Sequence, residues 1–189
     1  MSFFSKRLLL LNIFRFFSFF LSKKSGISIV TIHDVPIDSF TWFKNFIAFI
    51  DKNYGFIDPK DFIEGNYGNS DNRVLLTFDD GYYSNKVLAK KVLSKYKVKA
   101  IFFITEKFIN LDKVNAKDFS NKNFYPNSLN SARGFEESKP MTYDDLNWLV
   151  ENGHEIGAHT SNHLVLSKVK NPNKLLDEVV LHADRMEKV

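Results

Sequence analysis

The stretch VLLTFDDG, residues 74–81, determines how the rest of the chain is interpreted. Its apolar beginning is typical of a buried strand in a parallel sheet. Gly81 then permits a sharp turn that a side chain would hinder. The adjacent carboxylates of Asp79 and Asp80 repel one another at a strand end unless a cation or a proton separates them. The stretch therefore favours a metal site with one ligand and one base, against the alternative of a strand that ends in a solvated Asp-Gly turn.

A second stretch, HEIGAHTSNH at residues 154–163, again combines an apolar strand with polar residues. His159 and His163 lie four positions apart, so on one helical turn they would share a face. Two imidazoles and one carboxylate are a common catalytic metal set that leaves positions open for water or substrate. An isolated histidine pair is more often exposed or capping, but this pair follows a strand in a chain that already has Asp79-Asp80 at a strand end.

Together these stretches resemble the NodB-like polysaccharide deacetylases, carbohydrate esterase family four. TFDDG at residues 77–81 and HTSNH at residues 159–163 are similar to the first two motifs of that family. The resemblance covers about residues 27–170. Further segments that agree in order and spacing are Ile32-His33-Asp34, which resembles an early strand, KAIFF at residues 99–103, which resembles the second core strand, and residues 141–157, which resemble the helix and strand before the histidines.

The resemblance implies a distorted (β/α) barrel, and the alternation of predicted strands and helices independently indicates an α/β fold with a parallel sheet. We expect an N-terminal apolar amphipathic segment over residues 1–24 and a NodB-like deacetylase domain over residues 25–189, with core motifs in residues 73–170. The family's later motifs, an Arg-containing groove wall and a Leu-x-His segment with the general acid, have no counterpart before Val189. We therefore expect the barrel to be incomplete at its C-terminus.

Carried over residue by residue, the resemblance makes Asp79 the general base. It makes Asp80, His159 and His163 the ligands of one divalent metal ion, expected to be zinc. A divalent cation polarises an amide carbonyl and binds the attacking water, and a carboxylate takes the proton of that water. Tyr82 follows the first motif, and its backbone N–H is expected near the oxyanion by analogy with the family.

His33 and Asp34 follow the first predicted strand, just as Asp79 and His159 follow theirs. In parallel barrels, residues at this end of the strands build the active site. We therefore expect His33 and Asp34 to contact the substrate or to orient the metal-site residues. The alternative is a structural histidine at a strand end.

The sequence thus predicts a metal-dependent hydrolase that removes N-acetyl groups from a polysaccharide or another glycan. The alternative is a truncated, non-catalytic, membrane-associated domain that binds carbohydrate.

Composition agrees with a globular protein, since 44% of the 189 residues are hydrophobic and 25% are charged. The net charge of +4 is a small, scattered excess, so nucleic acid is not an expected partner. The absence of cysteine excludes disulfides and thiolate metal ligands.

Residues 8–21 are almost wholly apolar and lie between two pairs of basic residues. The run is shorter than the roughly 20 residues that a membrane-spanning helix needs. Its polar residues recur every three or four positions and form one stripe, which is typical of a helix in the membrane interface. We therefore expect peripheral membrane contact through residues 1–24 and a location in the cell envelope or at a membrane, on the cytoplasmic face or exported. A signal peptide and a helix packed on the barrel are the alternatives.

Hydrophobic spacing predicts the other elements of the domain. Residues 106–139 are polar with weak periodicity, as in a functional or disordered connection. The predicted strands are residues 27–32 and 100–104. The predicted helices begin with one through Phe40, Phe43, Ile47 and Ile50, a short one from Pro59 and one capped by Ser84. Two more follow: a helix with the capping box Thr142-Asp145 and an apolar face of Leu146, Leu149 and Val150, and a last helix with an apolar face of Leu175, Leu176, Val179, Val180, Ala183 and Met186.

Overall fold

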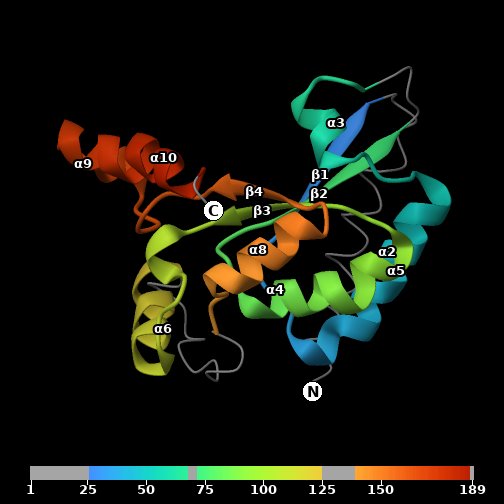
Figure 1. Cartoon of the computed structure of the whole chain (residues 1–189), viewed down its shortest axis with the longest axis horizontal. Coiled ribbons are helices and arrows are strands. Elements are labelled where there is room, and N and C mark those ends of the chain that lie inside the picture. The colour runs from blue at the N-terminus through green and yellow to red at the C-terminus, as the bar shows by residue number, and fades with distance from the viewer. Residues whose placement is uncertain (1–25, 68–71, 125–138, 188–189) are drawn as a thin grey trace, which may run out of the picture.

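The computed structural model describes residues 26–67, 72–124 and 139–187 (Figure 1). The segment expected at the membrane interface, residues 1–24, lies outside these described residues. Within them, no helix combines the length and the apolar composition that crossing a membrane requires.

A parallel sheet of four strands in the order β1-β2-β3-β4 lies at the centre of the molecule (Figure 1). β1 pairs with β2 along its whole length, whereas β2 and β3 share only two residue pairs. Because β1 and β4 form the two edges of this sheet, the described strands do not close into a barrel, in agreement with the expected incomplete distorted barrel. The strands are β1 (Ile27–Ile32), β2 (Arg73–Phe78), β3 (Ile101–Ile104) and β4 (Glu155–Ala158).

Helices alternate with these strands, as the sequence predicts. A π-helical turn at Ala89–Leu93 joins α4 to α5, another at Asp177–Leu181 joins α9 to α10, and a third at Ser120–Phe124 continues α6. The helices are α2 (Phe40–Asn53), α3 (Pro59–Ile63), α4 (Tyr83–Leu88), α5 (Ser94–Tyr96), α6 (Lys113–Phe119), α8 (Tyr143–Glu151), α9 (Pro172–Leu176) and α10 (His182–Met186), with 3-10 turns at Ile37–Ser39, Glu106–Phe108 and Leu166–Lys168.

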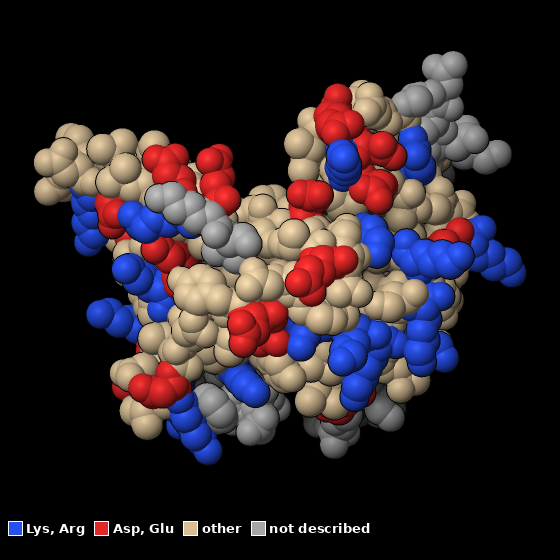
Figure 2. All heavy atoms as spheres, viewed as in Figure 1, with Lys and Arg blue, Asp and Glu red and all other residues tan. Residues whose placement is uncertain are grey.

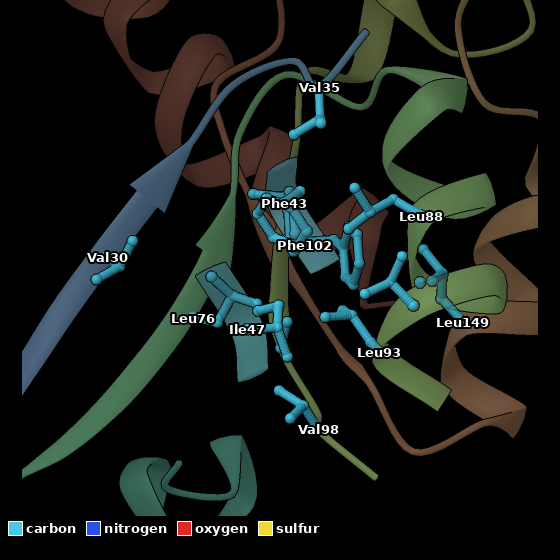
Figure 3. Packing of buried hydrophobic residues seen from close by; sticks show 14 of the residues in the cluster. Val30, Val35, Phe43, Ile47, Leu76, Leu88, Leu93, Val98, Phe102 and Leu149 are labelled. Atoms are coloured by element: carbon cyan, nitrogen blue, oxygen red, sulfur yellow. The ribbon is translucent and has the colours of Figure 1, made fainter. Parts of the chain in front are cut away.

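The main hydrophobic core lies between one face of the sheet and helices α2, α4 and α8 (Figures 1 and 3). Alternate residues of each strand reach this face, because successive side chains of a strand point to opposite sides. In Figure 3, Phe43 and Ile47 of α2 pack beside Leu76 and Phe102 of the sheet. The rings of Phe78 and Phe102 stack with their centroids 4.9 Å apart, so adjacent strands are tied together by aromatic packing.

The opposite face of the sheet carries a smaller cluster, in which Leu75 and Ile101 pack with Ile57 and with Phe62 of α3. Beyond α3 this face is open, and Ile29 is 56% exposed. A pocket of about 330 Å³ lies there, with Asp79 and His159 among the residues that line it. Figure 2 shows the molecule hollowed between α3 and the C-terminal helices. The strand ends are therefore accessible from this side.

The capping box of α8 forms as predicted, since the Thr142 and Asp145 side chains each accept the backbone N–H of the other residue. Two local predictions are wrong. Ser84 does not cap α4, because its hydroxyl donates to Asp34, and Val150 is 47% exposed instead of facing the core. Residues 113–124, predicted as part of an irregular connection, form α6 and its π-helical turn.

The apolar face predicted for the last helix is only partly buried, since Met186 lies in the core as expected but most of the other residues do not. Glu178, His182 and Met186, spaced four residues apart, are buried. The apolar residues Leu175, Leu176, Val179 and Val180 are 39–48% exposed. Tertiary contacts of the polar residues, and not hydrophobicity alone, therefore set the orientation of this helix.

Candidate metal centre and active site

The turn after β2 orients the two carboxylates differently. The Asp79 N–H donates to the Ile32 carbonyl at 2.8 Å, which ties the end of β2 to β1. Asp80 has a φ of 76° and Gly81 a φ of 96°, both in the left-handed region. A Cβ on Gly81 would lie 2.8 Å from Ile109 Cδ1, so both the backbone angle and the space require glycine here. This turn directs Asp80 inward, where it is 1% exposed, and leaves Asp79 at the open pocket.

Asp80, His159 and His163 converge at the C-terminal end of the sheet. Asp80 Oδ1 lies 3.6 Å from His159 Nε2 and 3.5 Å from His163 Nε2, and potential ligand atoms of the three residues all lie within 4.8 Å of one another. Two atoms bonded to one zinc ion at about 2.1 Å, at a tetrahedral angle, lie about 3.4 Å apart. In the described part of the chain, Asp80 Oδ1 has no hydrogen-bond partner although it is buried. These residues fit a divalent metal ion.

The electrostatics of the cluster agree with this fit. Burial raises the pKa of the Asp80 carboxyl to about 7, with His33 lowering it and the carboxylates of Asp79 and Asp34 raising it further. A divalent cation would favour the charged form that burial disfavours. Burial also lowers the pKa of His159, and the neutral imidazole is the form that binds metals.

The two histidines are held by backbone contacts as well. His163 Nδ1 lies 3.1 Å from the Asn123 carbonyl, which leaves Nε2 directed at Asp80. The His159 N–H donates to the Ile104 carbonyl at 2.9 Å, so the end of β4 is fixed against β3. Sequence reasoning missed the contribution of Asn123, because any residue type can provide a backbone carbonyl and the contact therefore cannot be predicted from the residue.

His33 is placed beside the carboxylate that the sequence assigns as base. Its Nε2 lies 3.8 Å from Asp79 Oδ2, and its side chain is 58% exposed. Asp34 instead faces α4, where it accepts a 2.5 Å hydrogen bond from the Ser84 hydroxyl, and Asn85 Nδ2 donates to the His33 carbonyl at 2.6 Å. Asp34 therefore helps to hold the segment that carries His33.

The Tyr82 side chain does not reach the metal ligands. It is 1% exposed, packs against the rings of Phe108 and Phe124, and its hydroxyl lies 3.3 Å from Ser120 Oγ. The structure thus gives this side chain a packing role, and the expected contribution of its backbone N–H to an oxyanion site stays a prediction.

Residues 66–189 match the family described as polysaccharide deacetylase, a span that covers more than half of the chain. The chain belongs to the polysaccharide deacetylase family. The motifs that carry the resemblance, at residues 77–81 and 159–163, both lie within this span and supply the converging side chains. No curated protein sequence matches the chain.

Solved structures of polysaccharide deacetylases share the fold of this member of the family. IcaB from Ammonifex degensii is 16% identical with a TM-score of 0.63, and the Streptococcus pyogenes deacetylase PplD is 18% identical with a TM-score of 0.56; each comparison covers 88% of this chain and 70% of the other. A polysaccharide deacetylase from Bacillus cereus is 15% identical with a TM-score of 0.61, over 88% of this chain and 48% of the other. At these identities the likeness establishes the fold.

Proposed function

We propose that this chain is a metal-dependent hydrolase that removes N-acetyl groups from a polysaccharide or another glycan. The observation that carries the proposal is the convergence of Asp80, His159 and His163 beside an accessible Asp79. Membership of the polysaccharide deacetylase family supports the substrate class. The Streptococcus pyogenes relative was solved in complex with acetate, which is the product that the proposed reaction would release.

Asp80, His159 and His163 would hold the ion, and the mixed imidazole and carboxylate donor set favours zinc. A bound divalent ion supplies the Lewis acidity that polarises the amide carbonyl and makes water more acidic. The protein's own contribution is to fix a buried carboxylate and two partly exposed imidazoles together and to leave an open side for the substrate.

In the proposed reaction Asp79 and His33 move the protons, because Asp79 lines the open pocket and His33 lies beside Asp79. In the proposed reaction the oxygen of water bonds to the carbonyl carbon while Asp79 takes a proton from that water. The C–N bond then breaks, and the amine nitrogen needs a proton to leave. We assign this donation to His33, because its side chain is exposed and its Nε2 lies 3.8 Å from Asp79 Oδ2. Acetate and the free amino sugar are the products.

Release of acetate from an N-acetylated glucosamine oligosaccharide by the zinc-loaded full chain tests the proposal. Asp80→Ala should lose both the metal, measured by elemental analysis, and acetate release. The exposed carboxylate of Asp184 provides a control, since Asp184→Ala should change neither. A zinc-loaded protein that binds the oligosaccharide without releasing acetate would contradict the hydrolase and support the non-catalytic carbohydrate-binding alternative.

A further inference from the structure

The loop between the two histidines of the metal cluster has an unfavourable backbone conformation. Thr160 has a φ of 64° and His163 a φ of 56°, and both residues carry a Cβ. Non-glycine residues persist in this region only when the surrounding structure over-determines them. The His163 N–H donates to the Thr160 hydroxyl at 2.9 Å, which closes the loop locally. Ser161 and Asn162 lie between these two residues, and their contacts tie the loop to the rest of the molecule.

One of these contacts comes from Glu106, which follows β3. Glu106 Oε2 accepts a 2.9 Å hydrogen bond from the Ser161 hydroxyl. The backbone N–H groups of Glu106 and Lys107 donate to the carbonyls of Thr160 and Ser161 at 3.3 and 3.0 Å. The segment after β3 therefore holds the first half of the loop through both its backbone and a carboxylate.

The second contact comes from Glu178, in the π-helical turn that joins α9 to α10. Its Oε2 accepts the Asn162 backbone N–H at 2.8 Å, and its Oε1 accepts Asn162 Nδ2 at 2.6 Å. The Ser161 N–H donates to the Glu178 carbonyl at 3.1 Å. Glu178 is 1% exposed, so these hydrogen bonds account for a carboxylate that would otherwise be costly to bury.

Arg185 of α10 fixes the Glu106 carboxylate in turn. Arg185 Nε lies 2.6 Å from Glu106 Oε1 and Nη2 lies 2.7 Å from Oε2, which is a bidentate pair of the kind that fixes orientation as well as distance. The hydrogen bond from Arg185 is the main cause that lowers the pKa of Glu106, so the carboxylate is charged at neutral pH. His182, fully buried, places Nδ1 3.5 Å from Glu106 Oε2. Asp177 contacts Arg185 at 3.1 Å from the other side.

We propose that Glu106 and Glu178 are positioning residues that set the affinity and geometry of the metal site by holding residues 160–163. This inference rests on the proposed function, because it presumes that Asp80, His159 and His163 bind the ion. Neither carboxylate belongs to the converging ligand set, and each acts through Ser161 or Asn162. Outer residues of this kind orient the ligands of a metal and keep their donor atoms pointed at it.

Zinc affinity of the full chain, measured by competition with a chromophoric chelator, tests the inference. Glu106→Gln and Glu178→Gln keep the size of each side chain but remove the charge and one acceptor atom. Each should weaken zinc binding by roughly 10- to 100-fold, the usual loss when an outer-shell partner is removed. The matched control is Asp184→Asn, which removes an exposed carboxylate of α10 that takes no part in the contacts described above, and it should leave affinity unchanged.

The visible absorption spectrum of the cobalt-loaded protein provides a second readout, which reports ligand geometry and which a merely structural role would not change. The spectra of Glu106→Gln and Glu178→Gln should shift, whereas that of Asp184→Asn should match the wild type. If Glu106→Gln fails to fold by circular dichroism, Ser161→Ala serves instead, since it removes only the hydroxyl that donates to Glu106. If Glu178→Gln fails to fold, Asn162→Ala serves, since it removes the side-chain amide that donates to Glu178.

Wild-type zinc affinity and an unchanged cobalt spectrum in the folded glutamine variants, or in Ser161→Ala or Asn162→Ala, would overturn the inference. A wild-type chain and an Asp184→Asn control that both fail to bind zinc would overturn the proposed function and the inference together. The two failures are therefore distinguishable.

Discussion

Gly81→Ala tests whether the turn that carries the two carboxylates depends on glycine. An alanine there must adopt a φ near 96°, which for an L-residue costs about 1–2 kcal/mol. Its Cβ would also lie 2.8 Å from Ile109 Cδ1, and Ile109, only 6% exposed within the core, has little room to move. Overpacking of a core costs roughly 1–3 kcal/mol. The free energy of unfolding should therefore fall by about 2–5 kcal/mol.

Gly65→Ala is the matched control, because Gly65 has a φ of 75° but an added Cβ would meet no atom within 4 Å. It should lose only the backbone contribution, about 1–2 kcal/mol. Urea unfolding followed by circular dichroism, with a chelator present so that metal binding does not stabilise the folded state, measures both values.

The steric part of the prediction can be isolated with Ile109→Val, which removes the Cδ1 methyl group that the new Cβ would meet. Alone, this change should cost about 0.5–1.5 kcal/mol. Combined with Gly81→Ala, it should be less destabilising than the sum of the two single changes, by an interaction energy within the roughly 0.5–3 kcal/mol range of contacting residues. Equal destabilisation by Gly81→Ala and Gly65→Ala, together with strict additivity in the double variant, would refute the reasoning.

Four further predictions concern catalysis, stability and location. Asp79→Asn should keep the metal but lower acetate release by roughly 10²- to 10⁴-fold, the usual contribution of a general base, and near wild-type turnover would contradict that role. His33→Ala should lower turnover while zinc content and thermal stability stay nearly unchanged; lost stability with unchanged activity per folded molecule would make His33 structural. Burial lowers the pKa of His154 from 6.5 to about 4, so as the pH falls the unfolded state binds a proton at this residue before the folded state does. The free energy of unfolding should therefore decrease as the pH falls from about 6.5 towards 4, by up to about 3 kcal/mol at 1.36 kcal/mol per pH unit. Urea titrations at several pH values should show that His154→Gln flattens this dependence. Removal of residues 1–24 should abolish co-sedimentation with anionic lipid vesicles, and equal partitioning of the two forms would argue against membrane contact.

Sequence reasoning succeeded where the determinants are local. The capping box of α8 depends on residues three positions apart, Thr142 and Asp145, and it forms as predicted. The turn after β2 is equally local, since Gly81 follows the two carboxylates directly and its φ is one that glycine adopts readily. Motifs of this kind, in which the interacting residues lie within one turn of the chain, can be predicted from the sequence without the tertiary structure.

Sequence reasoning failed where tertiary contacts compete with a local pattern. Ser84 has the residue type of a helix cap, but its hydroxyl donates to Asp34, 50 positions away. The apolar residues of the last helix suggested one buried face, whereas the structure buries Glu178 and His182 instead. Glu178, His182 and Met186 do lie four residues apart, which is the spacing of one helix face. Hydrophobic periodicity nevertheless favours the face with more leucine and valine residues, because it counts only apolar side chains as buried.

The two halves of the metal site therefore differ in how they are specified. Asp79 and Asp80 are placed by a turn in which Gly81 adopts its left-handed φ readily, and backbone hydrogen bonds to Ile32 and Thr105 hold the rest of this turn. His159 and His163 need residues 160–163 in a conformation with two left-handed non-glycine residues. This conformation is held by the carboxylates of Glu106, after β3, and of Glu178, in the last helix. Substitution of Glu178 or Arg185 in that helix, far along the chain from either motif, should for this reason alter metal binding more than their distance from the ligands suggests.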